Sequence, residues 1–155
     1  MEHLLGKLIE ARYIEWHRNY NNTDAVRDLF WAHPGSIDLL RAFPCILIMD
    51  CMYKMNRYRL PLLENVRVAS TDLIFFIAFA YIDIEREDNY IWALERLRSV
   101  MDADVLLELI VTDRDLALLN AIERIFSTAK HLLCRWHISK NVLAQCKRLF
   151  ETKEK

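Results

Sequence analysis

Two aspartates stand at the ends of apolar runs, a pattern by which strands deliver acids to a site. Asp50 closes the run CILIMD over residues 45–50, and Asp113 follows the apolar run over residues 106–112. In open α/β sheets, ligands gather beyond the carboxyl ends of such strands. Two strands of this kind could bring their carboxylates together at one end of the sheet. Each acid, taken alone, could instead be a solvated residue at a strand end.

Cys134 and His137 form a C-x-x-H pair. At a spacing of three residues the two could share one strand-to-helix turn, with His137 facing the acids. A structural zinc site needs four ligands, and no other cysteine or histidine stands at ligand spacing nearby, so we expect no structural zinc. On residue types alone, a structural histidine beside a buried cysteine is an equally good interpretation.

Basic residues gather just after the first of the two apolar runs. Lys54, Arg57 and Arg59 are interleaved with Tyr53 and Tyr58. Basic and aromatic side chains of this kind suit the phosphate backbone of a nucleic acid. The alternative is a solvated hairpin face, which the chain's overall charge makes at least as good an interpretation.

The composition limits the class of protein. With 155 residues, 54% of them hydrophobic, and only two glycines, the chain predicts one domain with a sizeable core. A net charge of −1 gives no support for nucleic-acid binding and does not exclude it. The four cysteines have no secreted-scaffold spacing and favour reduced thiols in the cytosol or nucleus. The most apolar run, residues 73–84, is too short to span a bilayer, so we expect no membrane partner.

Apolar periodicity predicts the elements that must position these residues. Residues 1–43 are expected to form a helical leader, with helices over 2–20 and 23–33 and one or two further turns over 36–43. Beyond residue 44 the expected strands cover 45–50, 60–68, 71–82, 106–112 and 130–134, with turns at Asn56 and Arg57 and over 70–72. The expected helices cover 85–101, 114–126 and 137–150, and a charged tail follows over 151–155.

That order predicts the fold class. Three short-linked strands form an antiparallel meander, and two αβ units then add strands parallel to the first one. Asp50 and Asp113 would emerge from the same end of neighbouring strands. This topology is similar to an RNase H-like sheet: an α/β, three-layer domain with a mixed five-stranded sheet over residues 44–150.

Five blocks in a fixed order resemble the Mutator-like element (MULE) transposase domain, found in plant and fungal elements and in domesticated far-red-response regulators. They run from about Asp28 to Val142 and read DLFWAHPGSIDLLRAFP, LIMDCMYKMNRYRLPLLE, FIAFAYIDIEREDNYIWALERL, IVTDRDLALLNAIERIF and LLCRWHISKNV. A lone TDR or C-x-x-H would be weak evidence, whereas five ordered blocks are specific.

The resemblance implies roles for particular residues. Asp50 and Asp113 correspond to the first two acids of a DDE-type triad that holds Mg²⁺ or Mn²⁺ for DNA strand cleavage and transfer. Cys134 and His137 correspond to the family's C-x-x-H signature and would support that site. DNA at transposon ends would be the partner, with a second copy or a full-length transposase as protein partners, and the location would be the nucleus.

The third acid of the family lies on a helix beyond the C-x-x-H signature, and this chain ends at Lys155. We therefore expect a fragment that is cut short before the last catalytic helix and does not transpose DNA alone. The alternative is a domesticated or degenerate non-catalytic DNA-associated regulator, or an interaction module. One departure from the family pattern stands out, because Arg67 replaces a usual glycine in a predicted strand, where a buried guanidinium is costly.

Overall fold

The computed structural model describes residues 1–42, 46–53, 56–68, 73–102, 105 and 107–151. Lys54, the turn predicted over 70–72 and the last four residues of the charged tail lie outside this part of the chain. The elements are α1 (Glu2–Glu10), β1 (Ile14–Asn19), β2 (Val26–Ala32), α2 (Pro34–Ala42), β3 (Ile46–Met52), β4 (Leu62–Val68), β5 (Ile74–Tyr81), α3 (Glu87–Val100), β6 (Leu109–Thr112), α4 (Leu116–Ile125), β7 (Lys130–Leu133) and α5 (Arg135–Glu151).

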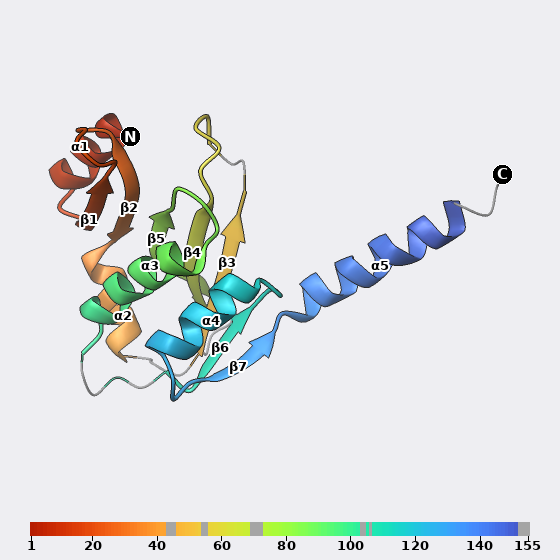
Figure 1. Cartoon of the computed structure of the whole chain (residues 1–155). Coiled ribbons are helices and arrows are strands. Elements are labelled where there is room, and N and C mark those ends of the chain that lie inside the picture. The colour runs from red at the N-terminus through yellow and green to blue at the C-terminus, as the bar shows by residue number, and fades with distance from the viewer. Residues whose placement is uncertain (43–45, 54–55, 69–72, 103–104, 106, 152–155) are drawn as a thin grey trace.

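The strands form one mixed sheet in the order β1-β2-β5-β4-β3-β6-β7 (Figure 1). The prediction of an α/β domain with a mixed sheet is confirmed, and so are the strands and helices expected beyond residue 44. The predicted number of five strands is wrong, because the described residues form a sheet of seven. The two additional strands come from the segment expected to be a helical leader.

Only the two ends of that leader are helical. Helix α1 ends at Glu10 with Ala11 as its C-cap, and Arg12 follows with a φ of 56°, a left-handed conformation that stops a helix. The chain then turns at Asn22, whose φ of 60° suits an asparagine, and returns as β2. The rings of Trp16 and Phe30 meet across β1 and β2 at 5.8 Å, and β2 pairs in turn with β5. Pairing with a distant strand therefore overrode the helical spacing.

Asp28 ties these first strands to the body of the domain. Its carboxylate is fully buried and accepts from Nε of Arg18 at 3.0 Å and from Nε of Arg27 at 2.7 Å. The guanidinium of Arg18 also donates to Asn89 at 3.0 Å and lies over the ring of Trp92 in α3. A buried charge is tolerated only when it is paired in this way.

The predicted meander and crossover are confirmed. Strands β3, β4 and β5 pair antiparallel in chain order, and β6 then pairs parallel to β3, with β7 parallel to β6. Parallel strands need a crossover, and α3 and α4 supply these connections while packing against each other (Figure 1). Arg67 is buried in β4, as the sequence suggested, and pairs with Phe75 of β5.

Helices α3 and α4 cover one face of the sheet. Side chains that point to this face, such as Leu47 and Met49 of β3, share the buried core with Tyr90, Leu94 and Leu118 of the two helices. The opposite face carries exposed apolar side chains over β3 to β5, among them Ile46, Val68 and Ile74. The predicted three-layer arrangement stays a prediction. No helix in the described ranges is long and apolar enough to cross a membrane.

Candidate acidic site at the ends of two parallel strands

Asp50 and Asp113 lie at the same end of neighbouring parallel strands. The register pairs Ile48 of β3 with Val111 of β6, and continuing it by two residues sets Asp50 beside Asp113. Alternation within β3 buries Leu47 and Met49, so Asp50 points to the face that α3 and α4 do not cover. The geometry thus brings together the two acids that sequence reasoning singled out.

Glu64 is a third acid at this place, and sequence reasoning missed it. It pairs directly with Asp50 across β3 and β4, so their side chains share one face. Burial raises the pKa of Glu64, and the negative charge of Asp50 raises it further. The turn predicted at Asn56 and Arg57 lies midway in sequence between Asp50 and Glu64. A hairpin with this turn sets the two acids opposite each other, and this is the signal that could have identified Glu64.

His137 comes to the acids from the first turn of α5. Its Nε2 lies 3.7 Å from Oδ1 of Asp50, which makes an ion pair when the imidazole is protonated. Its Nδ1 is buried and has no hydrogen-bond partner among the described residues, an unusual state for a buried polar atom. The imidazole thus turns Nε2 toward the carboxylate and Nδ1 toward the buried side.

Cys134 positions this turn through its backbone. Its N–H donates to the carbonyl of Thr112 at 2.6 Å, and its own carbonyl accepts from the N–H of Ile138 at 3.1 Å. Asp113, Cys134 and His137 line one cavity of about 340 Å³, together with Arg114, Leu133, Ile138, Asn141 and Val142. Three of the four residues predicted to be catalytic therefore share one pocket, and the fourth, Asp50, has its Oδ1 3.7 Å from Nε2 of His137.

The charge of Asp113 is disfavoured by its surroundings. Burial raises its pKa most, and the nearby carboxylates of Asp115 and Asp50 raise it too. The backbone N–H of Asp115 and the imidazole of His137 oppose this and lower the pKa. Like-charged carboxylates held close together are typical of sites that bind a cation.

Asp115 fixes the loop that carries Asp113. One of its oxygens caps α4 by accepting from the N–H groups of Ala117 and Leu118 at 2.7 and 3.1 Å. The other oxygen accepts from the hydroxyl of Tyr90 in α3 at 3.1 Å. Asp115 falls in the first turn of the helix predicted over 114–126, and in the structure it is the N-cap of α4.

Of the predicted basic segment, Arg57 and Arg59 lie exposed between β3 and β4. The side chain of Asn56 holds the turn by accepting from the N–H groups of Tyr58 and Leu60. The guanidinium of Arg57 stacks on the ring of Tyr58 and donates to its hydroxyl. The hairpin extends beyond the acidic end of β3 (Figure 1).

The donor set at this end of the sheet fits a hard divalent cation only in part. Carboxylates on rigid strands suit Mg²⁺ or Mn²⁺, which keep waters and substrate phosphates among their ligands. Within the described ranges, no group of three or more His, Cys, Asp or Glu side chains is arranged to hold a metal ion. Asp50 and Asp113 could therefore supply protein ligands to a cation whose other ligands come from water or phosphate.

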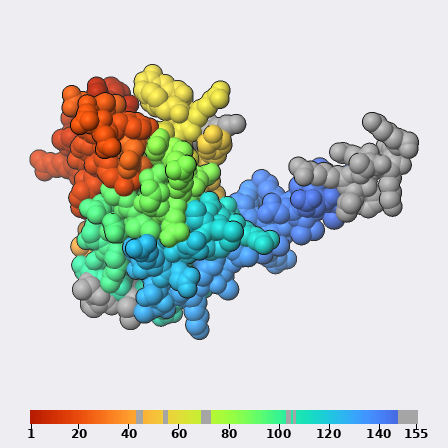
Figure 2. Space-filling model, viewed as in Figure 1, coloured from red at the N-terminus to blue at the C-terminus, as the bar shows by residue number. Residues whose placement is uncertain are grey.

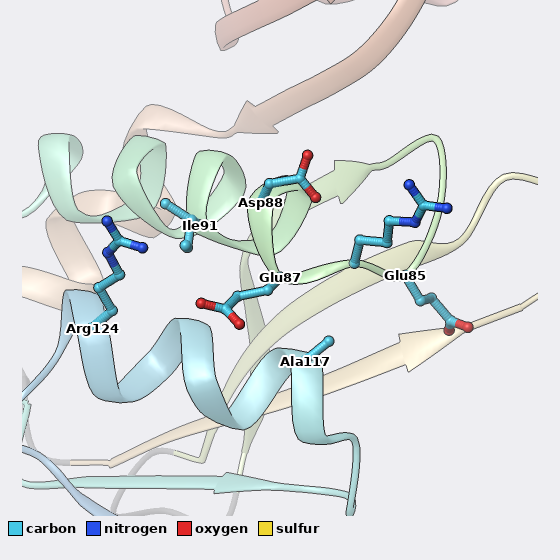
Figure 3. A pocket seen from close by; sticks show the side chains of 7 residues that line it. Glu85, Glu87, Asp88, Ile91, Ala117 and Arg124 are labelled. Atoms are coloured by element: carbon cyan, nitrogen blue, oxygen red, sulfur yellow. The ribbon is translucent and has the colours of Figure 1, made fainter.

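A second acidic region lies on the side of the sheet that the helices cover. Between α3 and α4, a cleft of about 490 Å³ is lined by Glu85, Arg86, Glu87, Asp88, Ile91, Ala117 and Arg124 (Figure 3). Its acids are accompanied by two arginines, and Glu87 accepts from Asn120 at 3.3 Å. Sequence reasoning assigned no chemistry to these residues, and the mixed charges suit a solvated groove between two helices.

The structure defines an α/β domain with a mixed sheet and an acidic site at the ends of two parallel strands. Residues 46–141 match the family model of the MULE transposase domain. The chain belongs to this family, as the five blocks predicted.

Several curated proteins are similar to most of the chain. Protein FAR1-RELATED SEQUENCE 5 from Arabidopsis thaliana is 30% identical over 126 residues, which cover 81% of this chain and 16% of that protein. Protein FAR-RED IMPAIRED RESPONSE 1 from the same plant is 23% identical, over 79% of this chain and 15% of its own length. A PKS-NRPS hybrid synthetase, cheA, from Chaetomium globosum is 23% identical, over 89% of this chain and 3% of its own length. The chain thus spans about a sixth or less of each of these relatives.

Proposed function

We propose that this chain is the metal-binding core of a Mutator-type DNA strand-processing domain with an RNase H-like fold. The observation that carries the proposal is the parallel register of β3 and β6, which sets Asp50 and Asp113 side by side. Family membership supports it, because the matched residues include both acids, Cys134 and His137. The order β5-β4-β3-β6-β7, with its meander and two crossovers, supports the RNase H-like topology.

In the proposed function each residue has a distinct task. Asp50 and Asp113 are the protein ligands of a DDE-type site, and His137 holds the carboxylate of Asp50 in place from α5. When bound, Mg²⁺ or Mn²⁺ would activate the attacking water or 3′-hydroxyl and stabilise the leaving oxygen. Arg57 and Arg59 of the exposed hairpin, with Lys54 of the same segment, would contact the phosphate backbone of DNA, and the protein would work in the nucleus.

Metal binding is the first test. Mn²⁺ titrated into the ¹⁵N-labelled chain should broaden the amide signals around Asp50 and Asp113, because a bound paramagnetic ion relaxes nearby nuclei. Asp50→Asn should abolish this broadening, whereas Asp24→Asn on the exposed turn after β1 should preserve it. Broadening that stays in Asp50→Asn, or that centres on Glu87 and Asp88 between α3 and α4, would contradict the proposal.

Strand chemistry is the second test. The described residues supply two strand-end aspartates and no third carboxylate arranged with them to hold a metal. The chain alone should therefore neither cleave nor join transposon-end DNA with Mg²⁺ or Mn²⁺. Robust strand transfer that is lost in Asp50→Ala would show instead that the chain carries a complete site.

A non-catalytic, DNA-associated regulatory role is the second candidate. The ion-pair distance between His137 and Asp50 favours it, since an imidazolium there would neutralise the acid without any metal. This alternative requires salt-dependent DNA binding that is indifferent to divalent ions and unchanged in Asp50→Asn. Fluorescence anisotropy with labelled DNA, measured with and without Mg²⁺, separates the two functions.

A further inference from the structure

The pairing between β3 and β6 ends before it reaches the two acids. Its last paired residues are Ile48 and Val111, and Asp50 and Asp113 lie two residues further on. Strand β4 holds Asp50, because Glu64 pairs with it, whereas Asp113 follows the last residue of β6. The pairing of these two strands therefore does not by itself fix the distance between the two carboxylates.

Cys51 lies directly behind Asp50, on the covered side of the sheet. Consecutive residues of a strand point to opposite faces, so Cys51 points toward α3 and α4, where it packs against the buried core. Its thiol is hydrogen-bonded to the hydroxyl of Tyr90 in α3 and to the carboxylate of Glu85. The end of β3 is thus attached to the start of α3.

The same hydroxyl reaches the loop that carries the second acid. Tyr90 donates to Asp115 at 3.1 Å, and the backbone N–H of Asp115 donates to Oδ1 of Asp113 at 3.4 Å. Helices α3 and α4 form a continuous surface over the sheet (Figure 2), and Tyr90 is fully buried. One buried hydroxyl therefore joins the residue after Asp50 to the residue that begins α4.

We infer that Tyr90 is a positioning residue, whose hydroxyl fixes the separation of Asp50 and Asp113 from the covered side of the sheet. It acts through Cys51 and Asp115. Its effect on metal binding rests on the proposed function. Mg²⁺ requires near-ideal octahedral geometry, whereas Ca²⁺ accepts flexible arrangements, so two carboxylates at a fixed separation favour the smaller ion.

Hydrogen exchange of the metal-free chain tests the connection itself. Tyr90→Phe removes only the hydroxyl, so exchange at the backbone N–H groups of Asp115 and Ala117 should become roughly fivefold faster, as expected for one lost hydrogen bond. Tyr20→Phe is the matched control, because it removes a hydroxyl that donates to Asp83 at 2.6 Å, and it should leave these N–H groups unchanged. Unchanged exchange in Tyr90→Phe, or an increase spread evenly over the domain, would overturn the inference.

Metal selectivity tests the positioning role. Displacement of Mn²⁺, followed by electron paramagnetic resonance, gives the affinities for Mg²⁺ and Ca²⁺. Tyr90→Phe should weaken Mg²⁺ binding about tenfold and Ca²⁺ binding less, since it loosens the separation of the ligands. A variant that is merely less stable would keep the ratio of the two affinities. Equal losses for both ions, or no loss in a chain that binds Mn²⁺, would overturn the positioning role.

Variants of Cys51 test the other half of the connection. Cys51→Ala should reproduce the loss of Mg²⁺ affinity, Cys51→Ser should retain most of the affinity, and Cys146→Ala, at an exposed position of α5, should have no effect. The double variant Tyr90→Phe/Cys51→Ala should lose little more than either single variant, because both remove the same connection. Fully additive losses would contradict the inference.

The two proposals fail in different ways. If the unaltered chain binds no Mn²⁺ at Asp50 and Asp113, the proposed function is wrong. The exchange measurement needs no metal, so it still decides whether the hydroxyl of Tyr90 holds the two segments together.

Discussion

Nε2 of His137 lies 3.7 Å from Oδ1 of Asp50, so a polar contact joins the first turn of α5 to the end of β3. The two residues are far apart in sequence and belong to elements that share little other surface. This contact makes the orientation of the Asp50 carboxylate depend on α5. It also shows which carboxylate the histidine of the C-x-x-H pair contacts.

His137→Ala should lower the affinity for Mn²⁺ by about tenfold, the usual effect of removing a group that orients a ligand carboxylate. The free-ion signal of Mn²⁺ in electron paramagnetic resonance measures this affinity. His3→Ala, at an exposed position of α1, is the control and should have no effect. Tighter binding in His137→Ala would mean that the imidazole competes with the metal for Asp50.

Asp113→Asn should stabilise the domain at neutral pH. Burial and the charges of Asp115 and Asp50 raise the pKa of Asp113 above its ordinary value of 3.8, so the folded state binds its proton more tightly than the unfolded state does. Stability from this group is therefore present below the ordinary pKa and is lost as pH rises through the folded value.

The gain in Asp113→Asn should follow the same titration. Urea unfolding of both proteins across pH should show a larger free energy of unfolding for the variant near pH 7 and a vanishing difference in acid. Asn keeps an oxygen that can accept from the N–H of Asp115, so the loop stays intact. Asp24→Asn at an exposed position serves as the control. A constant difference at all pH values would show that the charge is not the cause.

Asp28→Ala should destabilise the domain by about 3–5 kcal/mol, because it leaves the guanidinium of Arg18 without its buried partner. Chemical denaturation followed by tryptophan fluorescence measures the change. Asp38→Ala removes an exposed pair with Arg41 and should cost less than about 1 kcal/mol. Similar losses in the two variants would contradict the role given to the buried carboxylate.

Tyr90 and Asp115 should be energetically coupled. Tyr90→Phe removes one hydrogen bond worth about 1 kcal/mol, and Asp115→Ala removes that bond and the cap of α4, worth about 1 kcal/mol more. A double-mutant cycle should therefore give a coupling of roughly 0.5–1.5 kcal/mol. Strictly additive losses would place the hydroxyl of Tyr90 outside the network that holds the Asp113 loop.

The hairpin arginines should contribute to DNA binding through charge alone. Replacing Arg57 and Arg59 by Gln should reduce the slope of log affinity against log salt by about 0.9 for each phosphate that the variant no longer neutralises. Anisotropy titrations at several salt concentrations measure the slope. Lys7→Gln on α1 removes an exposed charge elsewhere and should leave it unchanged. An unaltered slope in the hairpin variants would show that Arg57 and Arg59 belong to a solvated turn and do not contact DNA phosphates.

The sequence predicted the elements beyond residue 44 because their signals are local. CILIMD is a short apolar run, and the apolar residues of α3 recur with helical spacing. Both elements could therefore be predicted without knowing their distant partners. The prediction of a helical leader over residues 1–43 was wrong because the structure of that segment depends on distant partners. Phe30 and Trp31 of β2 fit a helical spacing until Ala80 and Phe79 of β5 pair with them, about fifty residues further on.

The residues of the candidate site likewise fall into those that the sequence could predict and those that it could not. Asp50 and Asp113 could be placed together because parallel neighbouring strands share an end. Glu64 was within reach of the same reasoning, since a turn fixed at Asn56 and Arg57 sets its register against Asp50. The bond between Tyr90 and Asp115 was not, because it depends on how α3 packs against α4, which no local pattern encodes.

The buried carboxylate of Asp28 also sets an order of events during synthesis. Arg18, which pairs with it, needs Asn89 as a further partner 71 residues away, and β2 needs β5 for its sheet neighbour. The first two strands leave the ribosome long before either partner exists. They can pair with each other early, but the buried charge cluster is complete only after α3 has emerged, so we expect docking of this amino-terminal hairpin to be a late step of folding.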